Sequence, residues 1–154
     1  MILKIELENF FSIKDRVRID FRAANINTAL ARELGHNVMV WNGVPILKSV
    51  GLFGPNASGK SNVMKAINFC CRMILDSHLY NEGTVFNFEP FKFDGWQDKS
   101  SKFLIDFVCD NIEYEYSFEL TKERILSESL YHYPVGRRAK VFVREANGKY
   151  SFGT

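Results

Sequence analysis

The segment GPNASGKS at residues 54–61 constrains this 154-residue chain more than any other feature of its sequence. Its two glycines, its lysine and its final serine meet the spacing G-x-x-x-x-G-K-[ST] in full. An apolar run over residues 47–53 precedes it, and helix-like spacing over residues 60–75 follows it. A strand, a glycine-bounded loop and a helix together form a cradle for phosphate groups. The sequence therefore predicts a binding site for a nucleoside triphosphate.

The residue types of this segment match the chemistry of a triphosphate. Gly54 and Gly59 permit backbone angles closed to other residues and let N–H groups approach phosphate oxygens. Lys60 is predicted to reach the β- and γ-phosphates, and the Ser61 hydroxyl is predicted to be one ligand of Mg²⁺. The predicted cofactor-binding residues are Gly54, Pro55, Asn56, Ala57, Ser58, Gly59, Lys60, Ser61 and Asn62.

Hydrolysis needs more than this loop, because it requires a second carboxylate near Mg²⁺ and a group that orients water. Asp106, in the run FLIDF, is the best local candidate. Apolar residues resume directly after it and no second acid follows, so we interpret it as the water-exposed side of a strand. Asp76 ends a helical pattern and is interpreted as a surface residue near the helix end. We predict no catalytic residue in this chain.

The charge, the cysteines and the apolar runs of the sequence limit the class of protein, but they do not indicate a binding partner. The chain carries 20 basic and 18 acidic residues, a net charge of +2, which is too weak to indicate nucleic-acid binding by itself. Its three cysteines lack the spacing of a metal site and are predicted to be reduced thiols. No signal-peptide pattern and no apolar run of about 20 residues is visible. We therefore expect a cytoplasmic protein with no membrane partner.

The periodicity of apolar residues predicts an α/β fold. A mixed sheet is expected around the helix of residues 60–75, with an antiparallel β-meander beside it. The connection over residues 78–102 is long enough to be either functional or mobile. Asn42-Gly43 is predicted to be a two-residue hairpin turn. After the Asn42-Gly43 turn a strand is predicted to begin near Val44, and the run over residues 47–53 is predicted to continue as a strand into the loop. The other predicted strands cover residues 2–8, 17–21, 38–41, 103–109, 112–120, 124–133, 139–145 and 150–152.

Three stretches together resemble a known family: ENFFSIKD, LKSVGLFGPNASGKSNVMKAI and the Phe/Tyr-rich meander. They are similar to the amino-terminal lobe of ABC-type ATPases of the SMC/RecF/OLD group, in the bacterial branch described as AAA family ATPase, ATP-binding protein. The resemblance covers nearly the whole chain. It implies a P-loop NTPase fold, ATP as the nucleotide and a role for Asn56 in its pocket. It also implies that Ser12 and Lys14 lie near the nucleotide.

In that group a carboxy-terminal lobe supplies the Walker B acids, the ABC signature segment, the D-loop and a switch histidine. None of these motifs is visible here, and residues 126–130 echo the signature without its glycine. The resemblance thus implies that residues 1–154 are a partial ATP-binding head domain without its carboxy-terminal lobe. The implied partners are ATP, the missing lobe or a second head domain, and DNA or an associated nuclease in the full system. The implied process is DNA repair or phage defence, with this chain alone inactive.

Two alternatives stay open at this point. A small self-sufficient P-loop kinase or NTPase would need a lid with arginines and an acceptor site, and the β-rich second half of the chain argues against it. A non-catalytic nucleotide-binding module would use the same loop without turnover.

Overall fold

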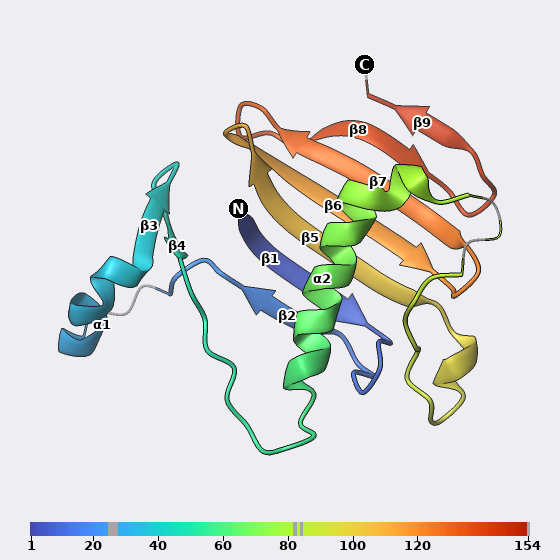
Figure 1. Cartoon of the computed structure of the whole chain (residues 1–154). Coiled ribbons are helices and arrows are strands. Elements are labelled where there is room, and N and C mark those ends of the chain that lie inside the picture. Colours follow the sequence, from blue (N-terminus) through green and yellow to red (C-terminus); the bar gives the residue numbers. More distant parts are fainter. Residues whose placement is uncertain (25–27, 82, 84, 154) are drawn as a thin grey trace.

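A seven-stranded sheet crossed on one face by a single long helix dominates the computed structural model, which describes residues 1–24, 28–81, 83 and 85–153 (Figure 1). The strand order is β2-β1-β5-β6-β7-β8-β9, and every neighbouring pair is antiparallel. Short turns join β5 to β9 in succession and permit only antiparallel pairing, so the predicted antiparallel meander is confirmed. The mixed sheet expected around the long helix is wrong, because β1 also pairs with both β2 and β5 in antiparallel fashion and no described strand of this sheet has a parallel neighbour. The strands are β1 Ile2–Glu8, β2 Val17–Asp20, β5 Ser101–Cys109, β6 Ile112–Leu120, β7 Ile125–Tyr133, β8 Ala139–Arg144 and β9 Tyr150–Phe152.

The long helix, α2, runs over Lys60–Asp76 and packs its apolar stripe on the sheet. Ala66, Cys70 and Met73 are fully buried, and their spacing of four and three residues places them on one face of the helix. Burial raises the pKa of the Cys70 thiol, so this thiol stays protonated in the core. The core residues around the helix include Ile5, Leu7, Phe10, Phe88, Phe103, Ile105, Tyr116, Phe118 and Leu120.

A second, two-stranded sheet lies to one side of the first (Figure 1). It is joined to the segment after β2 by backbone hydrogen bonds, in which Ala23 donates to Pro45 and Leu47 donates to Phe21, both at 2.8 Å. It pairs β3 (Val38–Trp41) with β4 (Val44–Leu47), after the short helix α1 (Ala29–Glu33) and the 3-10 turn η1 (Leu34–Asn37). Asn42 and Gly43 join the two strands with φ angles of 46° and 77°, which confirms the predicted hairpin turn.

The predicted strand over residues 47–53 is wrong. Strand β4 ends at Leu47, and residues 48–53 have no regular structure. Leu52 is 40% exposed and Phe53 is 95% exposed. An apolar strand inside a sheet needs a hydrogen-bonding neighbour on each side and a cover on both faces. Within the described ranges no strand pairs with this segment, so its apolar side chains face outward.

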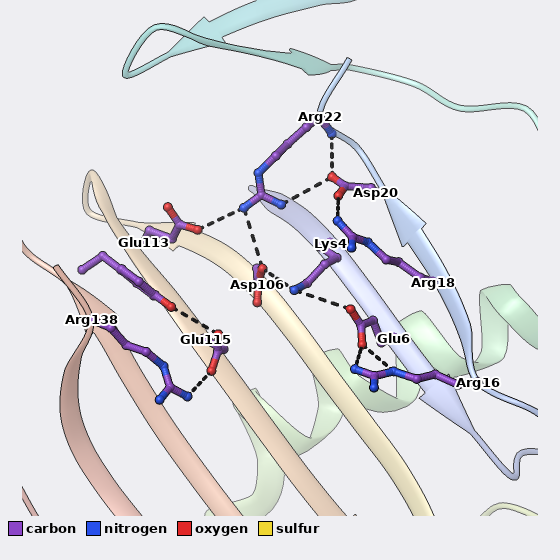
Figure 2. A network of polar contacts seen from close by, with 11 residues as sticks. Lys4, Glu6, Arg16, Arg18, Asp20, Arg22, Asp106, Glu113, Glu115 and Arg138 are labelled. Atoms are coloured by element: carbon purple, nitrogen blue, oxygen red, sulfur yellow. Dashed lines mark hydrogen bonds and ion pairs between the residues drawn. The ribbon is translucent and has the colours of Figure 1, made fainter. Parts of the chain in front are cut away.

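The face of the sheet opposite α2 carries a network of ion pairs, drawn in Figure 2. At its centre is Asp106, which is only 6% exposed, with Lys4 Nζ at 3.0 Å and the Arg22 guanidinium at 3.7 Å. The interpretation of Asp106 as water-exposed is therefore wrong. Strand alternation does place it on the polar face, but long charged side chains from β1 and the segment after β2 cover it.

This burial predicts an unusual pH dependence. Burial raises the pKa of Asp106; the neighbouring Lys4 and Arg22 oppose the rise, and the Glu115 charge adds to it. The folded protein thus holds this proton more tightly than the unfolded chain, so the stabilisation is full at low pH and is lost as pH rises. The unfolding free energy of Asp106→Asn should therefore increase relative to wild type between about pH 4 and pH 7, measured by urea unfolding.

Asp20 provides the matched control for that experiment. Burial alone would raise the pKa of Asp20, but hydrogen bonds from Arg18 and the Arg22 backbone outweigh it and lower the pKa. Its contribution to stability is present above the unfolded pKa and lost as pH falls, so Asp20→Asn should show the opposite slope. Equal slopes for the two variants would contradict the burial of Asp106.

Candidate functional site

The loop of residues 54–59 turns the chain sharply into the first residue of α2. Gly59, the residue before the helix, has a φ of 91°, which strongly favours glycine. A Cβ there would lie 3.2 Å from Ser12 Oγ, and a Cβ at Gly54 would lie 3.0 Å from Ser58 Oγ. The backbone angle at Gly59 therefore disfavours other residues, and at both glycines of the motif an added Cβ would lie close to a serine hydroxyl.

The Lys60 ammonium group is held across this loop. Its Nζ donates to the carbonyl oxygens of Gly54 and Pro55 at 2.8 and 2.6 Å, and lies 3.3 Å from Ser58 Oγ. All three acceptors are neutral, and no carboxylate of the described residues forms an ion pair with Lys60. The positive charge is thus fixed in place and remains free to attract an anion.

The same loop places the first turn of α2 beside a hollow, here called the loop pocket. Its volume is about 480 Å³. The first N–H groups of a helix lack partners within the helix and carry its positive dipole end, which favours an anion at this position. Among the predicted site residues only Gly54 and Pro55 do not line the pocket, since their carbonyls hold Lys60 instead. The lining residues are Ser12, Asn56, Ala57, Ser58, Gly59, Lys60, Ser61 and Asn62.

The turn between β1 and β2 forms one side of the loop pocket. Asn62 Nδ2 donates to Ser12 Oγ at 2.8 Å, so this turn is joined directly to the first helical turn. Ser12 therefore lies beside the loop, and its closeness to the nucleotide stays a prediction. Lys14 does not line the pocket, because its Nζ pairs with Asp94 Oδ2 at 2.7 Å.

A second hollow, here called the aromatic pocket, adjoins the loop pocket and shares Ser12 and Asn62 with it. Its volume is about 360 Å³. The rings of Phe91 and Phe93 stand 5.5 Å apart at 65° to each other. The remaining lining residues are Phe11, Glu89, Pro90 and Lys92. Sequence reasoning missed this pocket; the only signal was the aromatic run FEPFKF within a long connection.

Asn9 positions the wall of the aromatic pocket, and the sequence analysis assigned it no role. The residue is fully buried, and its Nδ2 donates to the carbonyls of Trp96, Lys99 and Ser100 at 3.0 to 3.1 Å. Its Oδ1 accepts the Phe91 backbone N–H at 2.9 Å. One side chain therefore fixes both ends of the segment that carries the pocket aromatics, so this part of the 78–102 connection is packed against β1.

No residue lining the loop pocket is acidic, and Glu89 of the aromatic pocket pairs with Lys122 at 2.7 Å. The Asp106 network lies on the opposite face of the sheet from α2 (Figure 2). Within the part of the chain that the structure describes, no group of three His, Cys, Asp or Glu residues could hold a metal ion. The loop pocket therefore has a cation and hydroxyl groups that can contact phosphate, but no carboxylate that could activate water.

Comparison with known families agrees with this chemistry. A family model described as "AAA domain, putative AbiEii toxin, Type IV TA system" matches residues 49–149, more than half of the chain and including the loop. The chain belongs to this AAA domain family. It is a family of P-loop, ATPase-like nucleotide-binding domains, and AAA ATPases generally use ATP and Mg²⁺. No protein in a search of curated sequences matches the chain. None of the described helices of this AAA domain is long and apolar enough to cross a membrane.

Proposed function

We propose that this AAA domain binds ATP with Mg²⁺ at the start of α2. The triphosphate would lie on residues 54–62, with Lys60 at the β- and γ-phosphates. The Ser61 hydroxyl, exposed in the first turn of the helix, would supply one Mg²⁺ ligand. The observation that carries the proposal is the Lys60 ammonium, which neutral oxygens hold at the pocket without neutralising its charge.

The aromatic pocket is the proposed site of the base. It adjoins the loop pocket through Ser12 and Asn62, and its Phe93 ring is 69% exposed and available for stacking. A base on an aromatic ring contributes about 1–3 kcal/mol. Phe93→Ala should therefore weaken ATP binding by about tenfold, measured by calorimetry, and leave the binding of inorganic tripolyphosphate unchanged.

A matched control exists for that substitution at the far edge of the sheet. Phe152 is 68% exposed on β9, so Phe152→Ala removes a similar ring far from the pocket. Equal weakening of ATP and tripolyphosphate by Phe93→Ala would mean that the ring does not contact the base.

We further propose that the carboxylates for hydrolysis come from elsewhere, as in the ATPases of the SMC/RecF/OLD group that the chain resembles. Two observations support this: no acid lines the loop pocket, and Val50, Leu52 and Phe53 form an exposed apolar segment directly before it. A carboxy-terminal lobe or a second head domain would cover that segment and complete the site. On the same resemblance we propose a cytoplasmic ATPase of DNA repair or phage defence, working on DNA or through an attached nuclease.

The competing function, a self-sufficient kinase or NTPase, is tested by turnover. A phosphate-release assay on this 154-residue chain with ATP and Mg²⁺ should give a rate well below about 1 s⁻¹, the lower end for efficient kinases. A faster rate that Lys60→Ala abolishes would show that the chain activates water by itself and would overturn this part of the proposal.

A further inference from the structure

A groove runs along the flank of α2, on residues that do not line the loop pocket. Its volume is about 780 Å³, larger than either pocket of the proposed nucleotide site and within the range of ligand sites. We call it the α2 groove. It is lined by Phe10, Phe11, Met64, Lys65, Asn68, Phe69, Arg72, Tyr80, Val85, Phe86 and Asn87.

The floor of the α2 groove is aromatic, but its rings are already in contact with one another. Phe10 packs edge-on against Phe11 at 4.8 Å, and Tyr80 packs edge-on against Phe86 at 5.7 Å. The Lys65 ammonium lies 4.6 Å from the centre of the Phe11 ring. A nucleobase needs an exposed ring face on which to stack, and every ring of this floor is buried or half-buried, whereas Phe93 of the aromatic pocket is 69% exposed. The α2 groove therefore favours an inserted apolar side chain over a stacked base.

Exposed apolar side chains border this floor. Met64 on α2 is 59% exposed and Val85 is 65% exposed, and both line the groove. Apolar surface gathered in a concave region, with a polar rim, is typical of a protein-binding site.

The rim carries positive charge. Lys65 and Arg72 lie seven residues apart on α2, two helical turns and about 10 Å along the axis. No carboxylate of the described residues forms an ion pair with Lys65. Among the described residues Arg72 forms an ion pair only with Asp76, at 3.9 Å, with both side chains well exposed, and such pairs contribute little. No described residue lining the groove is acidic, so an occupant with carboxylates is electrostatically complementary to it.

We propose that the α2 groove binds an acidic, amphipathic peptide segment of a partner protein. An apolar side chain of the peptide enters above Phe69 and Phe86, while its carboxylates pair with Lys65 and Arg72. This is the helix-in-groove mode of recognition, with apolar anchors and a charged margin. The proposal goes beyond nucleotide binding, since it uses neither the loop pocket nor Lys60, and among the lining residues the groove shares only Phe11 with the aromatic pocket.

The test uses a pair of labelled peptides of about 15 residues, one built from Leu and Glu and the other with Lys in place of every Glu. Fluorescence anisotropy with the full chain should show saturable binding of the acidic peptide only. The double variant Lys65→Glu/Arg72→Glu should lose at least about tenfold in affinity for the acidic peptide and should gain binding of the basic one. The control variant Arg137→Glu/Lys149→Glu changes two exposed cations outside the groove and should bind like wild type.

Several results would overturn this proposal. These are the absence of acidic-peptide binding, equal binding of both peptides, or an unchanged affinity in the double variant. Binding of an oligothymidine that the double variant loses, with no peptide binding, would assign the groove to nucleic acid. Concentration-dependent dimerisation abolished by the double variant, again without peptide binding, would assign it to a second copy of the chain. Circular dichroism and thermal unfolding establish that each variant is folded before its affinity is interpreted.

Discussion

The Lys60→Ala variant is expected to lose ATP binding altogether in a calorimetric titration with Mg²⁺. Lys60 is the only cationic residue among those lining the loop pocket. A unit charge about 4 Å from a phosphate charge is worth about 4 kcal/mol near a protein surface, which corresponds to roughly a thousandfold in affinity. The substitution should leave the thermal unfolding midpoint close to wild type, because the hydrogen bonds of the Lys60 side chain to described residues all lie within its own loop.

Lys65 supplies the control on the same helix. It lies one and a half turns farther along α2, contacts the Phe11 ring and does not line the loop pocket. Lys65→Ala should therefore bind ATP within about twofold of wild type, a change of less than 0.5 kcal/mol by the relation of affinity to free energy. If Lys60→Ala binds ATP as tightly as wild type does, the loop is not a phosphate site.

The Asn9→Ala variant is expected to lose at least about 3 kcal/mol of unfolding free energy, measured by urea denaturation. It removes four hydrogen bonds at a fully buried position and leaves three backbone carbonyls and the Phe91 N–H without that partner. Each buried polar group left unsatisfied costs about 1–3 kcal/mol. Asn9 also has a φ of 58°, a backbone conformation that asparagine tolerates better than alanine does.

The Asn111→Ala variant distinguishes the loss of buried hydrogen bonds from the effect of a positive φ angle. Asn111 has a similar φ of 62° but lies in an exposed turn, where its Oδ1 accepts one hydrogen bond from Trp41. Its replacement should cost no more than about 1 kcal/mol. Equal losses for the two variants would show that backbone conformation, and not the buried hydrogen bonds, accounts for the effect at Asn9.

The local elements of this fold were predictable because their signals lie within a few residues. The motif that ends in Lys60 and Ser61 predicts the start of α2, and the helix does begin at Lys60. The alternation from Ile112 to Leu120 predicts a strand with one buried face, and Tyr116, Phe118 and Leu120 are buried as expected. Asn147-Gly148 likewise forms the turn between the last two strands of the meander.

The failures concern contacts between distant parts of the chain. Residues 48–53 read as a buried strand, but a strand depends on neighbours that the sequence does not specify. Asp106 occupies the polar face that its alternation predicts, yet its burial depends on Lys4 and Arg22, more than 80 residues away in the chain. Asn9 is an ordinary polar residue of the stretch ENFF. Its hydrogen-bond partners lie after Glu89, in a segment whose apolar residues show no regular periodicity. Such contacts become visible only once the sheet has placed β1 beside β5.

We propose that ATP lies on the loop of residues 54–62, with its base in the aromatic pocket. The most direct test is a titration of the ¹⁵N-labelled chain with a non-hydrolysable ATP analogue and Mg²⁺, followed by amide chemical shifts. The largest shifts are expected at Gly59, Lys60 and Ser61, with a second group at Phe91 to Phe93. Shifts confined to the opposite face of the sheet, around Glu6, Lys102 and Glu119, or the absence of any shift at the loop, would contradict this proposal.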